Sequence, residues 1–233
     1  MTVFYLGKDP VFPPAGYSDP DGILAVGGDL SPERLMEAYT HGIFPWYSSE
    51  TPIIWWSPDP RFVIYPGEVK VSKSMRQVLK RKVFDIRFDT SFRDVITACS
   101  GRRKNESGTW ITPEMIEAYV TLHKMGYAHS VEAWRDGKLA GGLYGVSIGG
   151  MFFGESMFSR ESNASKAAFI VLAENLCRLG FDLIDSQVHT DHMKSLGAVY
   201  MDRDIFLELV ERSVKRETRK GDWGISPDFK TDL

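Results

Sequence analysis

Residues 129–155 read HSVEAWRDGKLAGGLYGVSIGGMFFGE, and this stretch decides the fold. It contains two runs typical of strands, 129–134 and 138–147, separated by Asp136-Gly137, a pair that favours a tight β-hairpin. A second turn at Gly149-Gly150 leads into a third apolar run, 151–155. The sequence therefore predicts a β-meander at the centre of the chain.

The segments around the meander predict helices and further strands. From about 163 to 179, small and apolar residues recur along one side, and Gly180 can end the helix. The run 183–188 follows as a short apolar strand. Before the meander come a helical pattern over 74–79, a strand-like run over 84–88, and a helix opened by Thr112-Pro113. This order predicts an α+β domain built on one mixed sheet flanked by helices.

The first 60 residues differ from the rest in being dense in Pro, Gly and aromatic residues. Only one helix is clear there: Ser31 can cap it, Pro32 fits its first turn and Gly42 can end it. The SPDP sequence at 57–60 restricts the backbone to extended geometry. We expect a small N-terminal domain over 1–60 and a larger domain over 61–233.

Composition excludes several classes of protein. The chain has 233 residues, 43% of them hydrophobic and 25% charged, as in an ordinary globular protein. No stretch approaches the roughly 18 apolar residues of a membrane helix, and residues 1–14 lack the features of a secretory signal. Cys99 and Cys177 form neither a disulfide framework nor a metal-binding pair. A cytoplasmic protein without membrane contact is expected.

The charge is unevenly distributed. The net charge is −3, yet residues 70–87 contain seven basic residues and one acid, so that segment carries +6 and the remainder −9. Such a run is either a solvated face or a contact for a polyanion such as nucleic acid. Residues 102–104 add a second basic group. The candidates for a nucleic-acid contact are Lys73, Arg76, Lys80, Arg81 and Lys82.

Familiar catalytic motifs are missing from the sequence. GESMF around Ser156 lacks the second glycine of a nucleophile elbow, and there is no Walker loop or G-x-G-x-x-G pattern. His189, Asp191 and His192 could offer metal ligands, but no third strong ligand with suitable spacing is evident. No metal site is therefore expected.

Three polar residues remain as candidates. Glu155 closes the run MFFGE, and Asp185 and Gln187 lie two apart in LIDSQV, where a strand would point both side chains to one face. An acid after Leu183 and Ile184 on a buried strand needs a partner or a chemical use. The alternative is that Asp185 ends the strand and caps the next turn.

Long blocks of the chain resemble a known family. GIFPW (42–46), WWSPDPR (55–61), GTWIT (108–112), FGESMFSR (153–160) and SLGA (195–198), in this order, are similar to the bacterial leucyl/phenylalanyl-tRNA–protein transferases. The resemblance runs from about residue 22 to 198. It implies that the larger domain is similar to the acetyltransferase (GNAT) fold but takes aminoacyl-tRNA in place of acetyl-CoA. No pyrophosphate-binding loop of the CoA-dependent enzymes is evident, and no cofactor is expected.

The resemblance also implies a reaction. Leu or Phe, with Met as a further donor, passes from Leu-tRNA or Phe-tRNA to the N-terminal Arg or Lys of an acceptor protein by ester aminolysis. Under the N-end rule, the new N-terminal residue then marks the product for degradation. The enzyme is expected to be a monomer. The rival hypotheses are a CoA-dependent N-acyltransferase of the same fold and a nucleic-acid-binding module without catalysis.

By the same resemblance, the site residues take roles. Asp185 and Gln187 are the expected catalytic pair, and Glu155 lines the same cleft. Trp46 and Trp110 are expected to form aromatic walls around the terminal adenosine and the aminoacyl group. The residues expected to line an apolar pocket for the donor side chain are Leu143, Phe152, Phe169, Leu172, Leu176 and Ile184.

Overall fold

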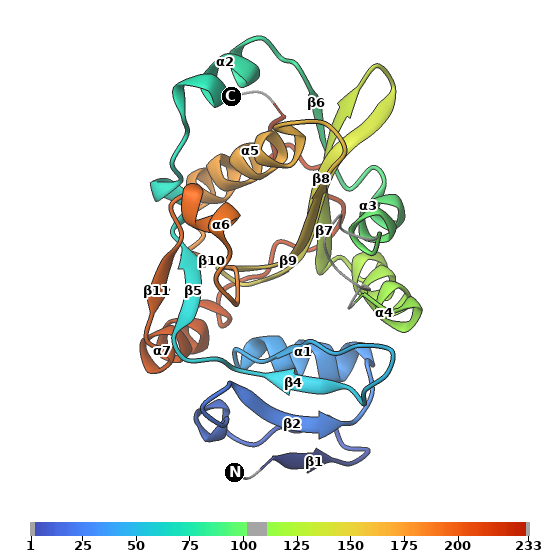
Figure 1. Cartoon of the computed structure of the whole chain (residues 1–233), viewed down its shortest axis with the longest axis vertical. Coiled ribbons are helices and arrows are strands. Elements are labelled where there is room, and N and C mark those ends of the chain that lie inside the picture. The colour runs from blue at the N-terminus through green and yellow to red at the C-terminus, as the bar shows by residue number, and fades with distance from the viewer. Residues whose placement is uncertain (1–2, 102–110, 232–233) are drawn as a thin grey trace.

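The computed structural model describes residues 3–101 and 111–231. Its strands form two sheets, a small one at the N-terminal end and a larger one that carries most of the helices (Figure 1). The arrangement is a mixed α/β fold. The predicted mixed sheet flanked by helices is therefore confirmed at this level.

The small sheet has the strand order β1-β2-β4-β3. Its strands are β1 (Phe4–Leu6), β2 (Ile23–Gly27), β3 (Phe44–Pro45) and β4 (Ile54–Trp56), and a 3-10 turn, η1, spans Ala15–Tyr17. Helix α1 (Pro32–Thr40) connects β2 to β3, and Ser31 caps it by accepting a hydrogen bond from the Arg34 N–H, as predicted. The sequence predicted the helix in this region but none of the four strands.

The larger sheet has the order β11-β5-β10-β9-β8-β7-β6. Strand β10 runs parallel to β9, whereas the other neighbouring pairs are antiparallel. The bounds are β5 Arg61–Ile64, β6 Asp85–Phe88, β7 Ala128–Arg135, β8 Lys138–Ile148, β9 Met151–Ser159, β10 Leu183–Asp185 and β11 Val199–Met201. Strands β7, β8 and β9 are the predicted meander. Positive φ angles at Asp136 (49°) and Gly137 (71°) form the predicted tight turn.

Helices cover both faces of the larger sheet. Figure 1 shows α5 on one side of β7 and β8, with α3 and α4 on the other. Neighbouring strand residues alternate between these layers: Leu143 and Phe152 join the core beneath α5, whereas Tyr144 and Phe153 join the core shared with α3 and α4. The helices are α2 Lys73–Lys80, α3 Phe92–Cys99, α4 Pro113–Lys124, α5 Ala164–Arg178, α6 Asp191–Ser195 and α7 Arg203–Ser213, and a 3-10 turn, η2, spans Pro66–Glu68.

The chain passes from one sheet to the other between β4 and β5. These strands end at Trp56 and begin at Arg61, so the SPDP segment forms the connection. Arg203, at the start of α7, fixes this connection by donating hydrogen bonds to Asp59 Oδ1 and the Ser57 carbonyl. No helix within the described ranges is long and apolar enough to cross a membrane.

Candidate active site

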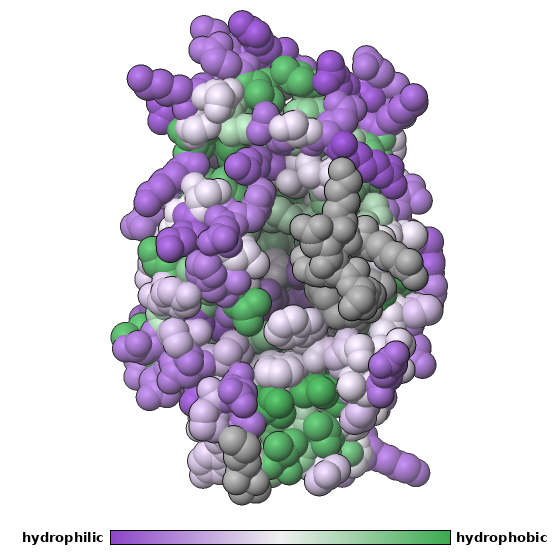
Figure 2. Space-filling view, viewed as in Figure 1, coloured by the Kyte–Doolittle hydropathy of each residue, from purple (hydrophilic) through white to green (hydrophobic). Residues whose placement is uncertain are grey.

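A cavity of about 790 Å³ opens where the two sheets meet. Its walls come from β3 of the small sheet, from β8, β9 and the start of α5, and from the segment after β10 up to α6. The face in Figure 2 is hollowed near its centre. The cavity thus combines the apolar layer beneath α5 with polar groups at strand ends.

Most of the predicted pocket residues line this cavity. Leu143, Phe152, Phe169 and Ile184 contribute apolar surface, and Trp46, Glu155 and Gln187 line it as well. The prediction does not hold for Leu172 and Leu176, which are fully buried in the core and do not line the cavity. They lie about one and two turns beyond Phe169 along α5, past the end of the cavity. Trp110 lies outside the described residues.

Asp185 is held in a buried ion pair. The Arg61 Nε and Nη2 atoms donate to its two carboxylate oxygens at 2.9 and 2.7 Å, and both side chains are almost fully buried. The Arg61 guanidinium also lies over the rings of Phe44 and Phe206, 4.7 and 4.5 Å from their centroids. The expectation that a buried acid here needs a partner is confirmed. The carboxylate does not line the cavity.

The Gln187 side chain faces the cavity because of a turn after β10, and not because Gln187 continues the strand. Strand β10 ends at Asp185, and Gln187 adopts a left-handed conformation with φ of 57°. The Gln187 N–H donates to Asp185 Oδ1 at 2.9 Å, which stabilises this turn. The prediction that both side chains share one strand face is therefore wrong. Asp185 points to Arg61, whereas the Gln187 side-chain amide donates to Glu155 Oε1 at 3.2 Å.

Glu155 lies in the most unusual electrostatic environment of the site. The Tyr39 hydroxyl donates to its Oε1 at 2.7 Å and the Tyr119 hydroxyl to its Oε2 at 3.0 Å. Burial raises the pKa of Glu155 to about 7, although the two tyrosine hydrogen bonds oppose this shift. A carboxyl group with this pKa exchanges protons near neutral pH.

Trp46 stands at the edge of the cavity, directly after β3. It is 39% exposed, so it is not an ordinary core tryptophan. Its backbone carbonyl accepts a hydrogen bond from the Trp56 indole at 2.6 Å, and the two rings are 5.6 Å apart. This contact fixes the position of an exposed aromatic surface beside the cavity.

The basic segment, residues 70–87, includes α2, which lies at the end of the molecule opposite the small sheet (Figure 1). Figure 2 shows hydrophilic side chains gathered at the end of the molecule where α2 lies. Lys73, Arg76 and Lys80 are exposed on α2, and Arg81 and Lys82 are exposed directly after it. Their surface borders a second cavity of about 760 Å³ between α2, β6 and α5. Residues 102–104 lie outside the described ranges.

Three residues of the site were not predicted from the sequence: Arg61, Tyr39 and Tyr119. Arg61 could have been noticed as a charge at the start of an otherwise apolar strand, RFVI. Tyr39 and Tyr119 gave no signal, because each continues the apolar face of its own helix. Within residues 3–101 and 111–231, no three His, Cys, Asp or Glu side chains converge as a metal site.

Comparison with known proteins gives consistent matches. A family model described as leucyl/phenylalanyl-tRNA protein transferase matches residues 63–211, and a model of that family's N-terminal domain matches 28–59. The chain is 57% identical over 235 residues to the leucyl/phenylalanyl-tRNA–protein transferase of Syntrophus aciditrophicus, covering all of this chain and 98% of the relative. It is 54% identical over 226 residues to that of Myxococcus xanthus, covering 96% and 97%. A solved structure of L-PGS from Bacillus licheniformis is 11% identical, with a TM-score of 0.37, and the match covers 83% of this chain and 73% of that chain.

The matched segments include residues of the site from both the N-terminal part of the chain and the larger sheet. The N-terminal match contains Tyr39 and Trp46, and the larger match contains Glu155, Asp185 and Gln187. High identity over almost the whole length of two relatives leaves no part of the site outside the comparison. The chain belongs to the leucyl/phenylalanyl-tRNA–protein transferase family and is an aminoacyltransferase.

Proposed function

We propose that the protein transfers Leu or Phe, with Met as a further donor, from aminoacyl-tRNA to the N-terminal Arg or Lys of acceptor proteins. The reaction is aminolysis: the acceptor α-amine attacks the aminoacyl ester, a peptide bond forms and tRNA leaves. The observation that carries the proposal is one cavity that joins an apolar wall to the Glu155 and Gln187 side chains. Family membership supports the choice of donor.

The apolar wall holds the donor side chain. Leu143, Phe152, Phe169 and Ile184 are lining residues with apolar side chains, which suits Leu, Phe or Met and opposes a charged side chain. Such a wall discriminates weakly among apolar side chains, by about 1–3 kcal/mol per methylene. Trp46 stacks against the terminal adenosine or the aminoacyl group. Trp110 is proposed for the same role from the resemblance.

Gln187 orients the reacting groups, and Asp185 acts through it. The Gln187 side chain reaches the cavity only because its backbone adopts the left-handed turn that Asp185 stabilises. Asp185 is in turn neutralised by Arg61. In this arrangement Gln187 touches the substrates, whereas Asp185 and Arg61 hold it in position.

The tRNA acceptor arm binds along the basic segment. Lys73, Arg76, Lys80, Arg81 and Lys82 place exposed positive charge on one end of the molecule, as phosphate contacts require. We further propose a GNAT-like larger domain over 61–233 and a small domain over 1–60, because the change of sheet falls between β4 and β5. We also propose that the protein is a cytoplasmic monomer and that its products are degraded.

The direct test is transfer of label from Leu-tRNA to a peptide. Incubation with an Arg-initiated peptide should extend it by one Leu at its N-terminus, and a Glu-initiated peptide of the same sequence should stay unmodified. Acetyl-CoA offered with the same peptide should give no product. Acetylation without leucylation would establish a CoA-dependent N-acyltransferase instead, and tRNA binding without loss of the ester would establish a non-catalytic module.

A further inference from the structure

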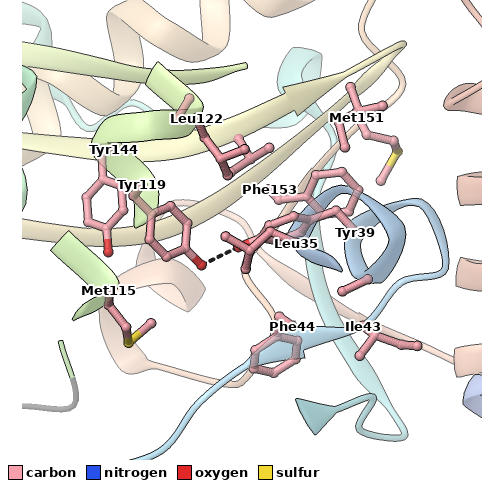
Figure 3. Close-up of a cluster of buried hydrophobic side chains, with 14 of the residues drawn as sticks. Leu35, Tyr39, Ile43, Phe44, Met115, Tyr119, Leu122, Tyr144, Met151 and Phe153 are labelled. Carbon is pink, nitrogen blue, oxygen red and sulfur yellow. Dashed lines mark hydrogen bonds between the residues drawn. The ribbon is translucent and has the colours of Figure 1, made fainter. Parts of the chain in front are cut away.

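Three oxygen-bearing side chains from different parts of the chain converge beside the cavity. Tyr39 comes from α1 of the small domain, Tyr119 from α4, and Glu155 from β9. Figure 3 shows the two tyrosines meeting through their hydroxyl groups, which are 2.5 Å apart. Both tyrosines are buried, whereas Glu155 is partly exposed and lines the cavity. We call these residues the Tyr39–Tyr119–Glu155 cluster.

When Glu155 is ionised, the cluster has more oxygen–oxygen contacts than hydrogen atoms that can bridge them. Its three oxygen–oxygen contacts are 2.5 Å between the hydroxyls, 2.7 Å from Tyr39 to Glu155 and 3.0 Å from Tyr119 to Glu155. Two phenol groups supply two hydrogens, so one contact lacks a hydrogen. A proton on the carboxyl group supplies the third, and each of the three groups then donates once. The cluster can therefore accept one proton without leaving a buried donor unpaired.

We propose that Glu155 carries the proton of the transfer reaction, and that Tyr39 and Tyr119 are positioning residues that hold its carboxyl group for this step. The inference rests on the proposed function. The neutral acceptor amine attacks the ester carbonyl, and a C–N bond forms. The proton from that nitrogen passes to the Glu155 carboxylate. As the bond from carbon to the ribose 3′-oxygen breaks, Glu155 returns the proton to that oxygen, so the carboxylate is regenerated.

The surroundings of the cluster favour Glu155 over Asp185 as the proton carrier. Asp185 is fully paired with Arg61 and does not line the cavity, so an incoming amine has no path to it. Asp185 raises and Arg61 lowers the pKa of Glu155, and these opposed charges leave burial as the main cause of its rise to about 7. That pKa lies close to the value of an α-amine, about 7.7–8.0, which favours proton exchange between the two groups.

Among the described residues, two further polar side chains lie beside the cluster, Gln187 and Tyr144, and neither carries a charge at neutral pH. Gln187 donates its amide hydrogen to Oε1. Tyr144, on β8, packs edge-on against Tyr119 with ring centroids 5.6 Å apart, and burial raises its pKa well above the usual value. Within the described residues the Tyr144 hydroxyl has no hydrogen-bond partner. Tyr144 therefore offers a matched control, a buried phenol next to the cluster that does not hold the carboxyl group.

The first experiment measures the protonation of the Glu155 carboxyl group and does not depend on the transfer reaction. In protein labelled with ¹³C at the glutamate carboxyl, the signal absent from Glu155→Gln should titrate near pH 7. Tyr39→Phe and Tyr119→Phe should each move this titration to higher pH, because the ionised carboxylate loses a donor. Tyr144→Phe should leave it unchanged. Titration below pH 5, or equal effects of all three tyrosine variants, would overturn the proposal.

The second experiment measures transfer from a short aminoacyl-adenosine donor. Glu155→Gln should lower kcat by about 10²–10⁴-fold with little change in KM, because the amide cannot accept the proton. Wild-type kcat should rise with pH through about 7, and the Tyr39→Phe profile should shift to higher pH. A Glu155→Gln variant with normal kcat and a raised KM would refute the carrier role. Absence of transfer by the wild type would refute the proposed function and this role together, whereas unshifted Tyr39→Phe and Tyr119→Phe titrations would refute the role alone.

Discussion

Separating the Arg61–Asp185 pair should destabilise the fold strongly, and removing both charges should restore part of the loss. The two side chains are 1% and 0% exposed and share two hydrogen bonds. Asp185→Leu leaves the Arg61 cation buried against two phenylalanine rings without its anion. Loss of one partner from such a pair costs about 3–5 kcal/mol. For a domain of this size the corresponding fall in Tm is about 6–20 °C.

The double variant Arg61→Met/Asp185→Leu removes both charges at similar volume. Its remaining defect is the Gln187 N–H, which loses its acceptor on Asp185. A buried donor without a partner costs about 1–3 kcal/mol, so the double variant should be more stable than either single variant. Turnover should not recover with stability, because Gln187 is no longer held in its left-handed turn. Stability and kcat are thereby separated.

The assay is urea unfolding followed by tryptophan fluorescence and by far-UV circular dichroism. The wild type, Arg61→Met, Asp185→Leu and the double variant form a double-mutant cycle. Transfer rates are measured at a temperature where all four proteins are folded. We expect a coupling free energy of several kcal/mol between Arg61 and Asp185. Single variants within 1 kcal/mol of the wild type would refute the buried-pair argument. A double variant with normal kcat would refute the claim that Asp185 acts by holding Gln187.

Three further predictions concern separate parts of the molecule. Trp46→Ala should weaken binding of an aminoacyl-adenosine fragment by about 1–3 kcal/mol, measured by calorimetry, and normal binding with a destabilised fold would show a purely structural role. Neutralising Arg76, Lys80 and Arg81 together should raise KM for aminoacyl-tRNA and make the plot of log affinity against log salt shallower by up to about 0.7–0.9 per lost phosphate contact, while a short donor is unaffected. An unchanged slope would remove this segment from the tRNA surface. The raised pKa of Glu155 stabilises the fold below pH ~4.5, and this contribution is lost as pH rises through about 7. Relative to Glu155→Gln, the wild type should therefore lose about 1–3 kcal/mol of unfolding free energy over that interval, and parallel pH curves would contradict the assignment.

The sequence predicts those elements whose signals are local. The meander, the helix from 163 onward and the caps at Ser31 and Thr112 follow from residues within a few positions of one another. The strands of the small sheet are only two to five residues long and pair with distant segments, so they leave no periodic pattern. Strand β5 is recognisable only through its partners β10 and β11.

The site divides in the same way. Glu155 and Gln187 could be selected from sequence because polar residues directly after apolar strand-like runs are conspicuous. The need for a partner at Asp185 followed from the cost of burying a charge, but its identity as Arg61, 124 positions away, required the fold. Gln187 does not share a strand face with Asp185 because its own left-handed conformation changes the direction of its side chain. Tyr39 and Tyr119 gain a role only through the convergence of three elements.

The contact of both Phe44 and Phe206 with the Arg61 guanidinium has a consequence for synthesis on the ribosome. Phe44 and Arg61 emerge early, whereas Phe206 follows Phe44 by about 160 residues. At about 5–20 residues per second, that separation corresponds to roughly 8–30 s. During this interval the nascent N-terminal segment presents Tyr39 and Phe44 without the helix and sheet that later cover them. The site therefore assembles among the last steps of translation, and a truncated chain lacking α7 leaves the Arg61 guanidinium without its contact to Phe206.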